Sequence, residues 1–256
     1  MNMKNLIKKG AELIRRSKNI LVFSGAGLST ESGIPDFRSP GGLWEKYNPS
    51  DFIYQRLLTD EKAREKYWRM STEFYDMMNN AQPNRAYLAI NELENMGKLL
   101  AIVTQNVDHL HHKAGNSPDK IIEIHGTAFS VSCQNCGRKY DRAEIERHLK
   151  AEFKVPYCND CSGFLKPDTI SFGQSMPADK MSLSFKYAAE SDLCIVLGSS
   201  LVVYPAAAVP ERAVESGAKL MIINRDITHL DRSADLAIHD SLSKALESIM
   251  EVCGRG

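Results

Sequence analysis

Four cysteines have a spacing that points directly to a chemistry. Cys133 and Cys136 form one Cys-x-x-Cys pair, Cys158 and Cys161 form a second, and 21 residues separate the two pairs. This spacing is close to that of a zinc ribbon, in which two tight turns present four thiolates to one tetrahedral ion. Four sulfur ligands leave no position for a reactive water, so we expect one structural Zn²⁺ that stabilises a small lobe. Two disulfides or free thiols are the alternatives.

Polar and glycine residues gather after five short apolar runs, where ligands of an α/β protein would bind. The five groups are Gly25 with Gly27, Gln105 to Asp108, His125 with Gly126, Gly198 to Ser200, and Asn224 to Asp226. Open parallel sheets bind ligands beyond the carboxyl ends of their strands, so we expect these groups to converge on one nucleotide-binding crevice. Two glycines before a helix would let backbone N–H groups approach a pyrophosphate.

The glycine turn alone is a weak signal for a nucleotide. The usual dinucleotide fingerprint has a third glycine three residues after Gly27, where this chain has Thr30, and Gly33 comes too late. This difference argues against a conventional hydride-transferring dehydrogenase. A tight strand-to-helix connection without a ligand is the other interpretation of the turn.

The elements that would position these residues alternate between strands and helices. We expect a helix over residues 3–17, a strand over 19–23 and the start of a helix within 29–33. Further strands are expected at 99–103, 121–124, 193–197, 220–223 and 236–238. Short, continuously apolar strands are typical of parallel sheets buried on both faces. The fold class is therefore α/β with a doubly wound parallel sheet, interrupted by a mostly helical insertion at 40–83 and the cysteine module at 130–166.

Composition limits the partners of the chain. The 256 residues contain 32 Lys plus Arg and 32 Asp plus Glu, so no global field recruits nucleic acid, and we expect no direct nucleic-acid binding. No apolar run approaches the length of a membrane span and no secretory leader is evident, so we expect a cytoplasmic protein without a membrane partner. The oligomeric state is left open.

Several long motifs together resemble the sirtuin family, the NAD-dependent protein-lysine deacylases. The first is the run from Gly25 to Arg38, which reads Gly-Ala-Gly-Leu-Ser-Thr-Glu-Ser-Gly-Ile-Pro-Asp-Phe-Arg and is followed by Gly42-Leu43-Trp44. Thr104-Gln105-Asn106-Val107-Asp108, Leu110-His111, Ala114-Gly115, His125-Gly126, the four cysteines, Phe172-Gly173, Gly198-Ser199-Ser200-Leu201 and Ile223-Asn224 follow in the family's order. The resemblance extends from about residue 10 to about residue 250. It implies a Rossmann-like NAD-binding domain made of residues 1–39, 84–129 and 167–256, and a small domain made of 40–83 and 130–166.

The resemblance also implies a role for each matched residue. The residues expected to bind NAD, as a co-substrate, are Gly25, Ala26, Gly27, Ser29, Asp36, Phe37, Arg38, Gln105, Asn106, Asp108, Gly198, Ser199, Ser200, Asn224, Arg225 and Leu242. The expected catalytic residues are His125, Asn106 and Asp108, with His125 as the general base that takes a proton from a ribose hydroxyl. Phe172, Gly173, Leu201 and Val203 are expected to bind the substrate peptide. Outside this motif context, Asn106 and Asp108 are ordinary turn residues and Phe37 an ordinary core aromatic. We expect His109, His111 and His112 to be non-catalytic.

Two departures bear on substrate choice. Gln174 stands where the family commonly has Glu, which removes a charge beside the expected peptide site. Sirtuins that prefer succinyl or malonyl lysine carry Tyr-x-x-Arg in the helical insertion, and this chain has Ser71 and Phe74 there. An apolar pocket disfavours a second carboxylate, so we expect acetyl or longer neutral acyl groups.

The function expected from these residues is NAD-dependent deacetylation of acetylated lysine-containing proteins. The products would be nicotinamide, deacetylated lysine and O-acetyl-ADP-ribose. Two alternatives remain open. One is a sirtuin-like mono-ADP-ribosyltransferase or NAD glycohydrolase, and the other is a non-enzymatic, zinc-containing acyl-lysine reader.

Overall fold

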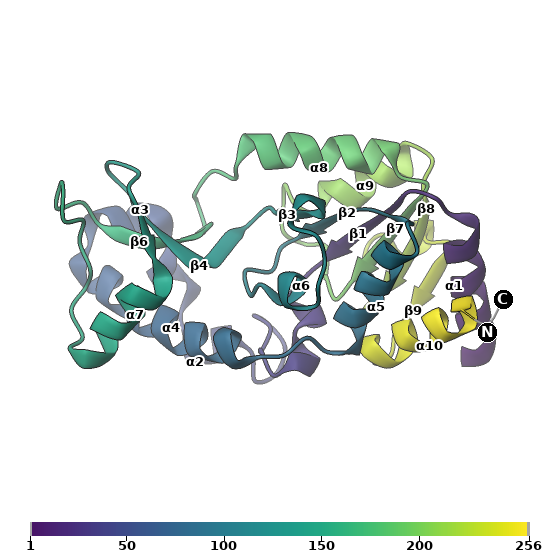
Figure 1. The fold of residues 1–256 in the computed structure, drawn as a ribbon, viewed down its shortest axis with the longest axis horizontal. Coiled ribbons are helices and arrows are strands. Elements are labelled where there is room, and N and C mark those ends of the chain that lie inside the picture. Colours follow the sequence, from purple (N-terminus) through teal and green to yellow (C-terminus); the bar gives the residue numbers. More distant parts are fainter. Residues whose placement is uncertain (1, 255–256) are drawn as a thin grey trace.

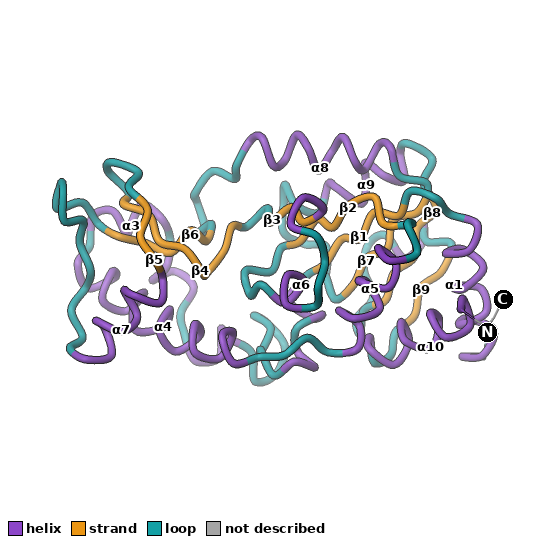
Figure 2. Tube along the Cα trace, viewed as in Figure 1, coloured by secondary structure: helices purple, strands orange, loops and turns teal. Residues whose placement is uncertain are grey.

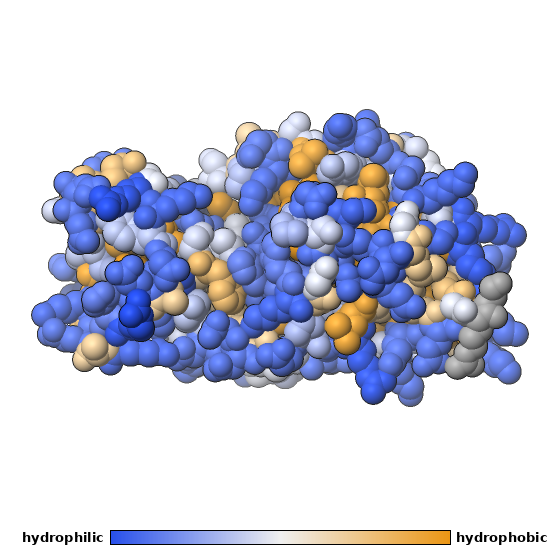
Figure 3. Space-filling view, in the orientation of Figure 1, coloured by the Kyte–Doolittle hydropathy of each residue, from blue (hydrophilic) through white to orange (hydrophobic). Residues whose placement is uncertain are grey.

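The computed structural model describes residues 2–254 and divides them into a larger and a smaller lobe (Figure 1). The first and last helices, α1 (Met3–Arg16) and α10 (Leu242–Gly254), pack together at the end of the larger lobe that lies away from the smaller one. No helix within residues 2–254 is both long and apolar enough to cross a membrane. On the face shown in Figure 3, the surface is mainly hydrophilic, and apolar groups show at the junction of the lobes.

Within the described residues, six parallel strands form the sheet of the larger lobe. Their spatial order is β3 (Ile121–Glu123), β2 (Leu99–Thr104), β1 (Ile20–Ser24), β7 (Leu193–Leu197), β8 (Lys219–Ile223) and β9 (Leu236–Ile238). The central strand β1 pairs in parallel with β2 on one side and β7 on the other, and all five of its residues are buried. Successive strands are therefore added on one side of β1 as far as β3, and on its other side from β7 onward. The point between β1 and β7 where this order switches is where open sheets bind ligands. The predicted parallel sheet and its six strands are confirmed.

Alternating side chains of the strands form two cores, one on each face of this sheet. Ile20 and Val22 pack in one core with α1, α10 and α5 (Arg85–Asn95). Leu21 and Phe23 pack in the other with α8 (Ala178–Glu190) and α9 (Ala208–Glu215). Helices therefore cover both faces, as Figure 2 shows, and the predicted doubly wound α/β class is confirmed.

The smaller lobe combines the helical insertion with the cysteine module. Its antiparallel sheet has the order β5 (Lys139–Asp141), β4 (Gly126–Cys133) and β6 (Leu165–Thr169). Its helices are α2 (Leu43–Lys46), α3 (Tyr54–Thr59), α4 (Glu61–Asn80) and α7 (Arg142–Ala151); one further short helix, α6 (Leu110–Lys113), follows β2 in the larger lobe. Trp68 of α4 is fully buried and donates a hydrogen bond to the Leu165 carbonyl at 3.0 Å, which ties the two segments together. The domain boundaries at 129/130 and 166/167 stay a prediction; β4 and β6 run across them.

A buried ion pair lies within α7, and its arginine joins α7 to α4. Arg142 Nη2 lies 2.7 Å from Glu146 Oε2, and their side chains are 1% and 4% exposed. The Arg142 guanidinium also donates hydrogen bonds to the hydroxyl and the carbonyl of Ser71 on α4, at 3.0 and 3.1 Å. The guanidinium carbon of Arg142 lies 4.9 Å from the ring centroid of Trp68 and 4.7 Å from that of Tyr75.

The prediction that an α-helix begins within residues 29–33 is wrong. Two short 3₁₀ turns, Ala26–Leu28 and Thr30–Ser32, stand there instead. Gly33 ends the second turn in the left-handed region at φ +85°, and the Ile34 N–H returns to the Ser29 carbonyl. Pro35 follows and cannot extend a helix, so the segment leaves the sheet as a loop.

Candidate active site

A cleft opens at the carboxyl ends of the central strands, and all five predicted strand-end groups contribute to it. Its empty volume is about 1530 Å³, including space open to solvent. Of the residues predicted to bind NAD, those that line this outer cleft are Gly25, Ala26, Gly27, Asp36, Phe37, Arg38, Gln105, Asn106, Gly198, Ser199, Ser200, Asn224, Arg225 and Leu242. Ser29 and Asp108 lie deeper, in an adjoining pocket.

Three glycines allow the loops after β1 and β7 to approach each other at the base of the outer cleft. A Cβ atom added at Gly25 would lie 2.8 Å from the Gly198 carbonyl oxygen, and one at Gly27 would lie 2.9 Å from the Gly198 Cα. Gly198 itself has φ +62°, and its added Cβ would lie 2.2 Å from the Leu28 nitrogen. Side chains at these positions would force the two loops apart, which explains the glycine-rich turn physically.

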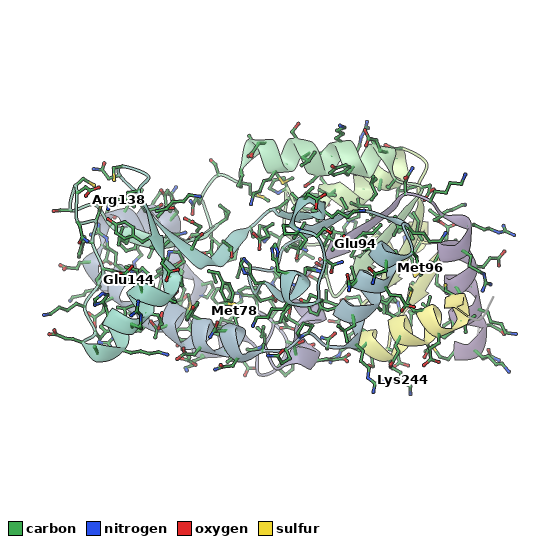
Figure 4. The ribbon with its side chains drawn as sticks, in the orientation of Figure 1. Met78, Glu94, Met96, Arg138, Glu144 and Lys244 are labelled. Carbon is green, nitrogen blue, oxygen red and sulfur yellow. The ribbon has the colours of Figure 1, made fainter. Side chains whose placement is uncertain are left out.

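The inner pocket lies between the two lobes and is lined mainly by apolar side chains. Its empty volume is about 1150 Å³, including open space. Met78, at the end of α4, faces this junction (Figure 4). Ser71 and Phe74, the residues aligned with the dicarboxylate-binding pair of some sirtuins, both line the pocket. The residues that line both the inner pocket and the outer cleft are Ala26, Phe37, Gln105, Asn106 and His125.

His125 stands at this junction with one ring nitrogen already engaged. Its Nδ1 lies 3.2 Å from the Gln105 carbonyl oxygen, which can only accept, so Nδ1 carries the proton and Nε2 is the nitrogen that can take up another. Burial lowers the pKa of His125, and the hydrogen bond to Gln105 opposes this shift. The imidazole is therefore neutral at pH 7, the form a general base requires.

Asn106 and Asp108 belong to a buried polar network. The Asn106 amide donates to the Gly25 carbonyl at 3.1 Å, and Ser29 Oγ and the Tyr87 hydroxyl lie 3.1 and 3.2 Å from it. Ser29 Oγ donates to Asp108 at 2.6 Å. Burial raises the pKa of Asp108 and raises that of Tyr87 well above its ordinary value. The network holds both side chains in one orientation at the wall of the inner pocket.

Tyr87 was missed by sequence reasoning. It lies on α5, far in sequence from each partner, and a tyrosine on an amphipathic helix is usually a core residue. Ile34 and Pro35 also line the inner pocket and were not singled out, although they belong to the same motif as Asp36 and Phe37.

The loop that carries Asp36, Phe37 and Arg38 is organised by its own aspartate. Asp36 accepts hydrogen bonds from the backbone N–H groups of Arg38 and Ser39 and from the Ser39 hydroxyl. Phe37 is 45% exposed and lies 5.4 Å from Trp44, centroid to centroid. Arg38 reaches across the outer cleft to Ser200 Oγ at 3.3 Å. The Phe37 ring is thus a cavity wall and not part of a core.

The predicted peptide-binding residues occupy different environments. Phe172 is 48% exposed and lines the inner pocket, and Val203 lines the outer cleft. Gly173 has φ +77°, and its carbonyl accepts a hydrogen bond from Gln55. Leu201 is 2% exposed and packs in a core, so only its backbone could meet a peptide; its neighbour Val202 is 59% exposed.

His111 has a structural environment. Its Nε2 lies 2.9 Å from the Ser24 hydroxyl in the sheet, and its ring packs edge-on against Tyr87 at 4.8 Å. Complete burial lowers its pKa to about 3, so it stays neutral. His111 lines neither cavity.

The four cysteines lie together at the far end of the smaller lobe. Their sulfur atoms are all within 4.8 Å of one another, with Cys133–Cys161 at 3.5 Å and Cys136–Cys158 at 3.6 Å. A disulfide needs about 2.05 Å, whereas a tetrahedral ion with Zn–S bonds of about 2.3 Å separates its sulfurs by about 3.8 Å. The Asn135 and Cys136 N–H groups point at Cys133 Sγ, as donors to a thiolate. The residues therefore fit the predicted zinc ion, and the disulfide alternative does not fit.

Comparisons with known proteins agree with this geometry. The model of the Sir2 family matches residues 25–205. An NAD-dependent protein deacetylase of Thermodesulfovibrio yellowstonii is 41% identical over 96% of this chain and 94% of its own. The structure of a histidine-to-alanine Sir2 variant with deacetylated p53 peptide and 3′-O-acetyl ADP ribose superposes with a TM-score of 0.89, at 35% identity, covering 99% of each chain. A Sir2 structure with p53 peptide and NAD⁺ superposes with a TM-score of 0.87, at 35% identity over the whole of both chains.

Proposed function

The chain belongs to the Sir2 family, and from that premise we propose that it is an NAD-dependent protein-lysine deacetylase. Relatives in bacteria and archaea are named NAD-dependent protein deacetylase or deacylase, and this chain matches them over nearly their full length. NAD is its co-substrate, one structural Zn²⁺ occupies the four-cysteine site, and proteins that carry acetyl-lysine are its partners. The mono-ADP-ribosyltransferase and the non-enzymatic reader receive no comparable support.

One observation carries the proposal: the outer cleft and the inner pocket meet at His125 and Asn106. A polar cleft at the switch point of the sheet suits a dinucleotide. An apolar pocket from the other lobe suits a neutral acyl-lysine stem. Where the two meet, the anomeric carbon of the nicotinamide ribose would face the acyl oxygen.

In the first step, we expect the acyl oxygen to attack that carbon while nicotinamide leaves. Asn106 and Asp108 would orient the ribose and the carboxamide, because their buried network has already fixed them. Phe37, on the loop that borders both cavities, would exclude water from the developing cationic centre. Exclusion matters because hydrolysis would consume NAD without removing an acetyl group.

In the second step, we expect His125 to accept a proton at Nε2 from a ribose hydroxyl. The hydroxyl oxygen then attacks the carbon of the bound acyl group. With one water consumed, the products are free lysine and O-acetyl-ADP-ribose. The hydrogen bond from Nδ1 to the Gln105 carbonyl keeps the accepting nitrogen turned toward the cavities.

The zinc site would serve the fold and not the reaction. It lies in the smaller lobe, outside both cavities, and its four sulfur ligands leave no open coordination position. By fixing β4 and β6, the ion would hold the wall of the inner pocket formed by the end of β6 and the residues after it, Thr169 to Phe172.

We further propose that acetyl and longer neutral acyl groups are preferred. The side chains of α4 that line the inner pocket carry no positive charge that could bind a second carboxylate; they are Tyr67, Met70, Ser71, Phe74 and Met78. Arg142, behind Ser71, is already paired with Glu146. A cytoplasmic location and the absence of direct nucleic-acid binding stay predictions.

The deciding experiment measures nicotinamide release from NAD on addition of an acetyl-lysine peptide, with mass spectrometry of the products. The wild-type protein is expected to yield O-acetyl-ADP-ribose. His125→Ala is expected to lower this yield by about 10²–10⁴-fold, the usual contribution of a general base. A folded, zinc-loaded His125→Ala protein that turns over normally would refute the mechanism, and ADP-ribosylated protein as the main product would refute the function.

A further inference from the structure

A second cluster of metal-ligating side chains lies at the edge of the large sheet, outside both cavities. Its members are His109, which precedes α6, His112 within α6, and Glu123, the last residue of the edge strand β3. Figure 1 shows α6 beside this edge. None of the three is used in the proposed reaction, although Asp108 and His125 are their close neighbours in sequence.

The separations within the cluster suit a shared ion better than direct hydrogen bonds. Glu123 Oε1 lies 3.5 Å from His109 Nε2 and 3.6 Å from His112 Nε2, and all three ligand atoms are within 4.8 Å of one another. A good N–H···O bond would be about 2.7–3.2 Å. A tetrahedral ion with bonds of about 2.0–2.1 Å would separate its ligand atoms by about 3.4 Å.

One ligand atom of the cluster has no hydrogen-bond partner among the described residues, and the neighbouring lysines bond elsewhere. His112 Nε2 is buried without a hydrogen-bond partner anywhere in residues 2–254. The two neighbouring lysines are engaged elsewhere: Lys113 Nζ bonds the carbonyls of Met78, Asn79 and Ala81, and Lys180 Nζ bonds the backbone carbonyl of Glu123. The Glu123 carboxylate, 15% exposed, therefore faces two imidazoles.

The backbone and the surrounding rings hold the ligands in place. His109 adopts φ +60°, a left-handed conformation that is uncommon for a residue other than glycine. Its ring stacks on Phe129 at 4.4 Å with an interplanar angle of 6°. Burial lowers the pKa of His109, which favours the neutral imidazole that a metal requires.

We propose that His109, His112 and Glu123 bind a first-row transition-metal cation such as Zn²⁺, Co²⁺ or Ni²⁺. Two imidazoles and one carboxylate suit these ions and not Mg²⁺ or Ca²⁺, which take oxygen ligands. The side chains of His109 and His112 are 33% and 29% exposed, so an ion can enter from solvent and keep water in its remaining positions. The site is chemically distinct from the four-thiolate site.

The test is a calorimetric titration in which Ni²⁺ alone is added to protein that retains its cysteine-bound zinc. The metal content of the protein is measured before and after the titration. The wild-type chain is expected to take up one Ni²⁺. His112→Gln and Glu123→Gln are each expected to weaken this binding at least 10-fold, with the zinc content unchanged at one per chain. His148→Gln, on the exposed face of α7, is the matched control and should bind like the wild type.

Three outcomes would overturn the proposal. They are no uptake by the wild type, equal uptake by His112→Gln and Glu123→Gln, or an equal loss in His148→Gln, which would mean adventitious binding to surface histidines. The test reads metal binding without NAD or peptide. The metal-site proposal can therefore be refuted while the deacetylase proposal holds, and the deacetylase proposal can be refuted while the metal-site proposal holds.

Discussion

The buried pair of Arg142 and Glu146 yields a quantitative prediction about the wall of the inner pocket. At 2.7 Å and an effective dielectric constant of about 20, the attraction of the two charges is about 6 kcal/mol. Desolvation costs several kcal/mol for each ion. Burial lowers the pKa of Arg142 even beside Glu146, so the penalty outweighs the attraction for this cation. The pair therefore contributes little net stability, yet removing one member leaves a buried charge without its partner.

A double-mutant cycle measures this asymmetry. Glu146→Leu and Arg142→Met are each expected to lower the free energy of unfolding by about 3–5 kcal/mol. The double variant removes both charges and should lose only about 1–3 kcal/mol, mainly because the Ser71 hydroxyl and carbonyl lose their donor. The double variant would thus be more stable than either single variant.

The assay is urea unfolding of zinc-loaded protein, followed by tryptophan fluorescence, since Trp68 lies 4.9 Å from the Arg142 guanidinium. Lys150→Met is the control, because Lys150 of α7 forms an ion pair with Asp76 of α4 at an exposed site. It should leave the unfolding midpoint unchanged. If the loss in the double variant equals the sum of the two single losses, the reasoning about desolvation is wrong.

Three further predictions concern the site. Because burial lowers the pKa of His125, kcat/KM should fall only as the pH drops through a value below 6.5, when the base becomes protonated; an acid limb centred above 6.5 in a pH–rate profile would contradict this assignment. Desuccinylation should have a kcat/KM at least about 100-fold below that of deacetylation, because an unpaired carboxylate is costly to bury. In a parallel peptide assay, Phe74→Arg should reduce this difference in kcat/KM, and the control Phe74→Leu should leave it unchanged. Removal of zinc with a chelator should unfold the smaller lobe and abolish deacetylation, while hydrogen exchange in β1 and β7 stays slow; loss of protection throughout the large sheet would show that the lobes are not independent.

Much of the fold was predictable because its signals are local. Each strand of the large sheet is a short apolar run, so Leu193–Leu197 and Leu236–Ile238 were placed to the residue. The segment after Gly27 was predicted wrongly as a helix, because the left-handed Gly33 and the return of the Ile34 N–H to Ser29 depend on a turn that apolar periodicity does not report.

The candidate site likewise contains some residues that the sequence predicts and others that it does not. Residues after strands were predictable, since parallel strands end at one edge of a sheet whatever their side chains contact. Partners supplied by distant helices were not: Tyr87 beside Asn106, and Arg142 behind Ser71, are long-range contacts without a local pattern. The inward direction of Leu201 was also unpredictable, because its backbone adopts φ +56°.

By itself, the sequence determined the α/β class, and it predicted the four-cysteine zinc site and the residues expected to face the nucleotide, since these follow from spacing and from the order of motifs along the chain. Only the tertiary structure decided that two cavities share His125 and Asn106, and that Glu123 meets His109 and His112. The physical reason is that both outcomes depend on how strands and helices far apart in the sequence pack against one another, and packing selects distances of a few ångströms that no local residue pattern specifies.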